Sequence, residues 1–116
     1  MPARVAHFEI QGPNDEQTAA FYRELLGWPT DPRGPGYTLI DGAAAGLGGA
    51  IADTPECRVV LGVAVPDLDA AIARVAELGG EVLMPPTDNG WVTKALVTDP
   101  GGNQLSLIAE KPGGGR

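Results

Sequence analysis

The chain contains almost none of the side chains on which nucleophilic catalysis and cysteine-based metal binding depend. Its 116 residues include one histidine, His7, and one cysteine, Cys57. A lone cysteine excludes an internal disulfide, and we therefore expect a reduced, cytoplasmic location. Any catalytic triad would need His7 as its base. Cys57 lies in a predicted linker, away from any helix start that would activate it, so we interpret it as an unreactive thiol.

Basic residues and long apolar segments are also scarce. Eight Lys and Arg stand against fifteen Asp and Glu, which gives a formal net charge of −7. Nucleic-acid binding needs clustered basic side chains, and here they are scattered, so we expect no nucleic-acid partner. No apolar run approaches the roughly 18 residues that span a bilayer, and the first ten residues lack a signal-peptide core, so we expect no membrane partner. The acidic balance favours a neutral or cationic ligand.

What the chain does contain is one order of elements that occurs twice. Residues 7–28 run strand, loop, helix and glycine, and residues 60–82 repeat that order. Gly27 and Gly79 end the two predicted helices, and three further strands follow in each half. A half-chain of this size cannot bury a core alone, so the halves must pair, and a pocket would form at their seam. The pattern is β-α-β-β-β twice, which predicts an α+β fold.

In the first half, the period of two predicts a strand over residues 5–10, with Phe8 and Ile10 on one face. Asn14 is predicted to cap the following helix, with Gln17 completing a capping box. The core stripe of this helix is predicted to include Ala20, Phe21 and Leu25, with Trp28 capping its end. A turn-rich segment (29–35), a strand (37–40) and a glycine-rich strand (46–51) follow. The glycines indicate either a group packed close to the backbone or a bulged or edge strand.

In the second half, residues 53–58 form a linker and residues 59–65 a strand. Asp67 caps a helix that ends at Gly79-Gly80, and its predicted core face is Leu68, Ala71, Ile72, Val75 and Leu78. Strands over 81–84, 91–97 and 103–108 follow, with Asp99–Asn103 as a tight turn without a catalytic role. We expect a single domain, residues 1–110, with modules of about 4–52 and 58–110, and a disordered tail at 111–116.

Three segments together resemble the vicinal oxygen chelate superfamily of glyoxalases, bleomycin-resistance proteins and extradiol dioxygenases. They are HFEI with FYRELLGW, VPDLDAAIARVAELGGEVLMPP, and VTDPGGNQLSLI. The resemblance implies a glyoxalase-like fold in which two βαβββ modules form a curled eight-stranded sheet around a cup. It also implies a homodimer, because related small members pair modules across two chains, and open sheet edges favour the same outcome.

The resemblance does not extend to a metal cofactor. In metal-dependent members, His and Glu ligands come from the first and last strands of each half. His7 stands at the first such position, but the matching positions hold Val60 and Ser106, and the glycine-rich strand offers only Gly48–Ala50. A divalent metal needs three or four well-placed donors. With three of the four ligand positions lost, we expect no cofactor, and a divalent metal is the alternative.

The predicted ligand-binding residues line the expected cup. Glu9 shares a strand face with His7, and the pair would suit proton abstraction; alternatively, His7 only hydrogen-bonds a backbone carbonyl. Trp91 follows a turn and is either a stacking platform for a planar or cationic ligand or a residue that closes the rim. The predicted set is His7, Glu9, Val60, Trp91 and Ser106. On strand 59–65, Val60, Gly62 and Ala64 are predicted to face the cup, and Leu61, Val63 and Val65 the second helix.

Two classes of function remain open. In the first, the chain is a metal-independent protein that binds a small molecule and sequesters a toxic natural product, as bleomycin-resistance proteins do, which would confer antibiotic resistance. In the second, it is a lyase or dioxygenase-type enzyme that uses a divalent metal or a base formed by His7 and Glu9.

Overall fold

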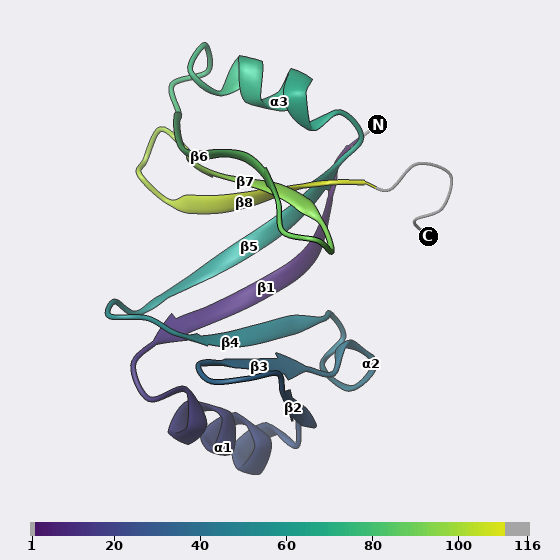
Figure 1. The fold of residues 1–116 in the computed structure, drawn as a ribbon, viewed down its shortest axis with the longest axis vertical. Coiled ribbons are helices and arrows are strands. Elements are labelled where there is room, and N and C mark those ends of the chain that lie inside the picture. Colours follow the sequence, from purple (N-terminus) through teal and green to yellow (C-terminus); the bar gives the residue numbers. More distant parts are fainter. Residues whose placement is uncertain (1, 111–116) are drawn as a thin grey trace. The chain divides into compact units, whose positions relative to one another are not determined.

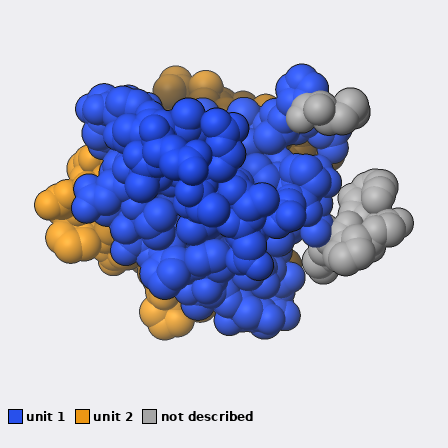
Figure 2. Space-filling view, turned by 90° about the horizontal axis from the view of Figure 1, so that it is seen from above, with its two compact units in different colours: residues 1–5, 61–116 blue, residues 6–60 orange. Residues whose placement is uncertain are grey.

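Two compact units make up the described part of the chain. The computed structural model describes residues 2–110, with eight strands and three helices assigned among them (Figure 1). The N-terminal unit contains residues 6–60, and the C-terminal unit contains the described residues from Leu61 onward together with those before Ala6 (Figure 2). The α+β class and the two βαβββ modules are confirmed. The predicted tail at 111–116 lies outside the described residues. Within residues 2–110, no helix is long and apolar enough to cross a membrane.

The N-terminal unit contains a mixed sheet in the order β2-β3-β4-β1. Its elements are β1 (Arg4–Gly12), α1 (Asp15–Leu26), β2 (Thr30–Pro32), β3 (Tyr37–Ile40), α2 (Gly42–Ala45) and β4 (Gly49–Asp53). β1 runs parallel to β4, and the other pairs are antiparallel. Ala19, Ile40 and Ile51 form the core between α1 and the sheet, and Phe8 and Ile10 pack against them. The predicted facing of Phe8 and Ile10 is therefore confirmed in the packing.

The start and the buried face of α1 differ from the predictions. Asn14 adopts a left-handed conformation (φ 64°) and makes no side-chain cap hydrogen bond, so the predicted capping box is wrong. Phe21 and Leu25 are 57% and 64% exposed, while Ala19 is buried. The helix is thus rotated away from the predicted stripe, because a small alanine lets α1 approach the sheet closely. The predicted end at Gly27 is confirmed by its φ of 73° and by its N–H bond to the Arg23 carbonyl.

An aromatic cluster closes the end of this core. The ring of Trp28 stacks on Tyr22 with centroids 5.6 Å apart, and the ring of Phe8 lies 5.9 Å from that of Trp28. Phe8 in turn explains part of the glycine-rich segment. A Cβ added at Gly49 would meet the Phe8 ring more closely than side-chain carbons ever approach one another. Trp28 is therefore a core residue as predicted, and a close approach to the backbone is the reason for one glycine.

The rest of the glycine-rich segment is not strand. Asp41 caps the short helix α2 by accepting a hydrogen bond from the Ala43 N–H at 3.0 Å, and β4 begins only at Gly49. The predicted strand over residues 46–51 is therefore confirmed only from Gly49 onward. The short strand β2 was also missed, because Thr30–Pro32 lies among prolines and glycines that are typical of turns.

The C-terminal unit contains four strands in the order β5-β8-β7-β6. Its elements are β5 (Arg58–Val65), α3 (Leu68–Val75), β6 (Glu81–Asp88), β7 (Thr93–Thr98) and β8 (Gln104–Ala109). β5 and β8 are parallel, and the remaining pairs are antiparallel. The core consists of aliphatic residues: Val65, Leu68, Ala95, Val97 and Leu107 are buried, and Val63, Ala71, Ile72 and Val75 pack against them.

Most predictions for α3 are confirmed. Asp67 caps the helix by accepting the Ala70 N–H at 3.0 Å. Val63 and Val65 face this helix as expected, whereas Leu61 is exposed. Leu78 is 60% exposed, because α3 ends at Val75 and Leu78 lies in the turn that follows. Its placement on the helical core face was therefore wrong.

The strands after α3 begin and end at different places from those predicted. β6 extends to Asp88, past two prolines, and its pairing with β7 shifts register at two points. Such irregularities are typical of edge strands that carry proline. β7 begins at Thr93, so Trp91 lies in the preceding turn rather than on a strand.

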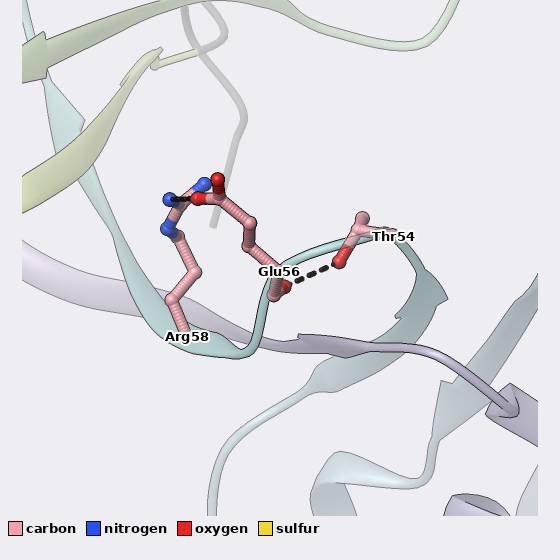
Figure 3. Close-up of polar contacts among 3 residues, drawn as sticks. All are labelled: Thr54, Glu56 and Arg58. Carbon is pink, nitrogen blue, oxygen red and sulfur yellow. Dashed lines mark hydrogen bonds and ion pairs between the residues drawn. The ribbon is translucent and has the colours of Figure 1, made fainter.

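The predicted linker is held by local contacts. Thr54 Oγ1 donates to the Glu56 carbonyl at 2.7 Å, and Arg58 Nη2 lies 2.6 Å from Glu56 Oε1 (Figure 3). The Thr54 N–H also donates to the Gly12 carbonyl at the end of β1. Cys57 is exposed between these contacts. β4 ends at Asp53 and β5 begins at Arg58, in agreement with the predicted linker over residues 53–58.

Candidate functional site

The face of the N-terminal sheet that turns away from α1, here called the far face, carries a group of polar side chains. Pairing in the sheet is Glu9–Ala50–Leu39 and, two residues further along each strand, Gln11–Ala52–Tyr37. Residues paired across neighbouring strands point to the same side of a sheet, and alternate residues along a strand point to opposite sides. Because Phe8 and Ile10 pack toward α1, their neighbours His7, Glu9 and Gln11 lie on the far face.

Glu9 and Gln11 form a hydrogen-bonded pair on this face. Gln11 Nε2 donates to Glu9 Oε2 at 2.7 Å, and both residues are half-buried. A hydrogen bond to a carboxylate is stronger than one between neutral groups, so it fixes the orientation of the Glu9 side chain. One carboxylate oxygen, Oε2, is thereby held by the protein.

Tyr37 adds a phenol to the same face. Burial, and after it the negative charge of Glu9, raise the pKa of Tyr37 above its ordinary value of 10.0. The phenol therefore stays protonated at neutral pH and can donate a hydrogen bond. Between the polar residues of β1 and Tyr37 on β3, β4 contributes only the methyl groups of Ala50 and Ala52 to this face. The far face thus combines an oriented carboxylate, an amide and a phenol around a small apolar floor.

Sequence reasoning found only part of this group. His7 and Glu9 follow from the period of two along one strand, and Gln11 could have been found in the same way. Tyr37 could not, because its place beside Glu9 depends on the register of β3 with β4 and of β4 with β1.

The structure places the other predicted site residues as follows. Val60 is buried on β5 and belongs to neither helix-packed cluster of the described residues. Ser106 is half-buried on β8 and pairs with Gly62 and Leu96, on the side of the C-terminal sheet that turns away from α3. Trp91 is 67% exposed in the turn between β6 and β7. The structure brings His7 and Glu9 onto one face. A ligand-binding role for any of the five residues stays a prediction.

The Asp99–Asn103 segment is a structural turn, as predicted. Asp99 accepts hydrogen bonds from the Asn103 side chain and from the Asn103 backbone N–H, each at 2.9 Å. These bonds, the side-chain bond first, hold the pKa of Asp99 below its ordinary value. All of the partners are local, so the carboxylate closes the turn.

Comparison with known proteins identifies the family. The profile of the glyoxalase-like domain matches residues 7–108. The chain belongs to the glyoxalase-like family. The resemblance to the vicinal oxygen chelate superfamily is thereby confirmed. A crystal structure of a glyoxalase/bleomycin resistance protein/dioxygenase superfamily member from Vibrio splendidus 12B01 matches with a TM-score of 0.72 at 15% identity, over 94% of this chain and 100% of that chain. This likeness concerns the fold alone.

Two curated relatives are more similar in sequence. The anthracycline biosynthesis protein DnrV of Streptomyces peucetius is 32% identical, over 91% of this chain and 46% of that protein. The Mycobacterium tuberculosis protein CFP32, whose name describes it as a candidate glyoxylase, is 31% identical, over 85% of this chain and 42% of that protein. This glyoxalase-like chain therefore spans less than half the length of these two relatives.

The far face of the N-terminal sheet offers few donors for a catalytic divalent metal. Among residues 2–110, no three His, Cys, Asp or Glu side chains gather where they could hold an ion. On β4, the far-face positions are taken by Ala50 and Ala52, neither of which has a donor side chain. The Glu9 carboxylate is held by Gln11 instead. Three or four N, O or S donors are needed for such a metal.

Proposed function

We propose that this glyoxalase-like chain binds a small molecule on the far face of its N-terminal sheet and that it does so without a metal. The observation that supports this proposal is the Glu9 carboxylate, which a 2.7 Å hydrogen bond from Gln11 orients, while no group of three His, Cys, Asp or Glu side chains among residues 2–110 could hold a metal ion. A carboxylate held in this way serves as a hydrogen-bond acceptor for a ligand rather than as one ligand of a metal triad.

The chemistry of the far face favours a mostly apolar ligand with one or two polar handles. Glu9 accepts hydrogen bonds, the protonated phenol of Tyr37 donates one, and Leu39, Ala50 and Ala52 supply apolar contact area. Small-molecule sites commonly combine a mainly apolar surface with a few placed polar groups. The formal net charge of −7 attracts a cationic ligand and repels an anionic one at low ionic strength.

Sequestration of a natural product is the role that best fits such a site. A relative named as an anthracycline biosynthesis protein shares 32% identity with this chain. Anthracyclines combine a planar aromatic ring system with an amine, which matches the apolar floor and the carboxylate. A protein that holds such a compound lowers its free concentration, and this requires affinity but no chemical step.

Calorimetric titration with daunorubicin, an anthracycline, tests this proposal. We expect saturable binding to protein stripped with a chelator, and unchanged affinity after Zn²⁺, Mn²⁺ or Fe²⁺ is restored. Glu9→Gln should weaken binding about tenfold, the effect of losing one charge-assisted hydrogen bond. Glu24→Gln on the exposed side of α1 is the matched control. It should leave the affinity unchanged apart from the small effect of a net charge that is one unit less negative. Binding that appears only after a metal is added would overturn the proposal.

The negative charge of Glu9 acts on the phenol of Tyr37. This pair favours a second candidate, a metal-independent proton transfer. Here the Glu9 carboxylate takes a proton from a carbon next to a carbonyl group, the Tyr37 hydroxyl hydrogen-bonds the resulting enolate oxygen, and the proton returns to the carbon. Carbonyl compounds incubated with the protein in D₂O would exchange that hydrogen for deuterium. We expect Glu9→Gln to abolish this exchange; equal exchange in the variant and in buffer alone would remove the candidate.

A further inference from the structure

A cavity of about 260 Å³ lies on the other side of the N-terminal sheet, between the first turns of α1 and the segment that joins β2 to β3. Its walls include Asp15, Ala19 and Arg23 of α1, Thr38 of β3 and Pro35. At roughly 30 Å³ for each water molecule, the space is larger than one or two structural waters require. It is separate from the site of the proposed function, because Thr38 pairs with Ile51 and so points toward the helix side of the sheet.

Two polar residues of this cavity are mostly buried. Asp15 is 9% exposed and Thr38 is 4% exposed, and they are the buried polar or charged residues of the described chain. No hydrogen bond or ion pair to either side chain occurs among residues 2–110, and no polar side-chain atom there is both fully buried and without a partner. The carboxylate of Asp15 and the hydroxyl of Thr38 therefore remain accessible, and the cavity is where they can meet a hydrogen-bond donor.

The remaining charges of the cavity favour a positively charged guest. Glu16 adds a second carboxylate to the wall. The one cation of the wall, Arg23, donates from Nη1 to Thr30 Oγ1 at 3.1 Å, at the exposed rim. An ionised carboxylate only accepts hydrogen bonds, so the guest must be a donor. Ala19 and Pro35 provide apolar contact for a short carbon chain.

We propose that this cavity binds a small primary alkylammonium ion. Its ammonium group donates to the Asp15 carboxylate and the Thr38 hydroxyl, and its alkyl chain lies against Ala19 and Pro35. The three N–H donors of an ammonium group match these two buried acceptors and leave one donor for Glu16 or water.

A titration with n-butylammonium chloride, followed in ¹H–¹⁵N spectra, tests the assignment. We expect saturable shifts of the backbone amides around Asp15 and Thr38, at constant chloride concentration. Asp15→Asn keeps the shape and removes the charge, and it should weaken binding about tenfold. Thr38→Val removes only the hydroxyl and should weaken binding several-fold. Glu24→Gln, on the same helix but outside the cavity wall, should leave the affinity unchanged.

Three results would overturn the assignment. The first is the absence of saturable shifts in this region with n-butylammonium. The second is equal binding of butan-1-ol or butyrate, which have the same length without the positive charge. The third is unchanged affinity in Thr38→Val, which decides the matter even if Asp15→Asn fails to fold. Daunorubicin binding on the far face should be the same in Thr38→Val and in the unchanged protein, so a failure of one proposal is distinguishable from a failure of the other.

Discussion

The two units share one order of elements but differ in what they place on the sheet face away from their helix. In the N-terminal unit this face carries Glu9, Gln11 and Tyr37. In the C-terminal unit the equivalent positions on β7 and β8 pair Leu96 with Ser106 and Lys94 with Ile108. The comparison shows that a repeated βαβββ frame fixes which residues share a face, while the chemistry of that face is specific to each copy.

The cores differ as well. The N-terminal core includes aromatic side chains, with Trp28 stacked on Tyr22 and in tilted contact with Phe8, whereas the C-terminal core is aliphatic. α1 leaves Phe21 and Leu25 exposed, but α3 turns its apolar residues toward its sheet. Similar patterns of apolar spacing therefore produced helices with different buried faces.

The largest expected effect is a loss of stability when a side chain at the centre of either core is shortened. Ile51→Ala in the N-terminal unit should lower the free energy of unfolding by about 2–5 kcal/mol, since the side chain is fully buried and its removal leaves a cavity. Leu107→Ala in the C-terminal unit should lower the free energy of unfolding by an amount in the same range but smaller, because Leu107 is slightly exposed. Urea unfolding of both variants measures the difference. A larger loss for Leu107→Ala would contradict the view that the difference in burial sets the order of the two losses.

A second prediction concerns the glycine under the Phe8 ring. Gly49→Ala should lower the free energy of unfolding by about 1–3 kcal/mol, because the added methyl group would collide with that ring. Gly48→Ala is the matched control one residue away, where an added Cβ meets nothing within 4 Å. Thermal unfolding of the two variants gives the comparison. Equal stability would mean that the ring does not lie over Gly49.

A third prediction separates the starts of the two long helices. Asp67→Ala should lower the free energy of unfolding by about 1 kcal/mol, since it removes the hydrogen bond to the Ala70 N–H. Asn14→Gly should cause no such loss, because Asn14 makes no cap bond and its φ of 64° suits glycine. If chemical denaturation showed Asn14→Gly to be the more destabilised variant, the cap assignment at α1 would be wrong.

The smallest expected effect is a change in the pKa of Tyr37. Because the negative charge of Glu9 helps to keep the proton on the phenol, Glu9→Gln should lower the pKa of Tyr37. The pKa should not fall to its ordinary value, since burial, the larger cause, remains. In the unchanged protein the ionisation therefore comes at higher pH than in the variant. NMR titration of the tyrosine side chains gives both values, with Tyr37→Phe to assign the signal and Glu24→Gln as the charge control.

The sequence predicted the elements better than their packing. The strand over residues 37–40, the Asp67 cap and the facing of Val63 and Val65 follow from local patterns and are confirmed. The buried face of α1 and the exposure of Leu78 could not be predicted in the same way, because apolar spacing alone does not say where a helix ends or which of two apolar stripes meets a sheet.

For the candidate site, prediction from the sequence was limited because the sequence did not show how the strands pair. The period of two placed His7 and Glu9 on one face, but only the register of three strands brings Tyr37 to it. Trp91 was expected on a strand and lies in a turn, because the turn bonds of Asn89 extend to the N–H groups of Trp91 and Val92. The homodimer, the cytoplasmic location and the roles of Val60, Trp91 and Ser106 stay predictions.

One measurement tests the central claim most directly, namely that the far face of the N-terminal sheet binds a small molecule without a metal. Chelator-treated, ¹⁵N-labelled protein is titrated with daunorubicin, and the shifted backbone amides are mapped onto the chain. We predict that the largest shifts fall on β1, β3 and β4, around Glu9, Gln11 and Tyr37, and that they disappear in a Glu9→Gln, Tyr37→Phe double variant. Shifts confined to other elements, or shifts that persist in the double variant, would contradict the claim.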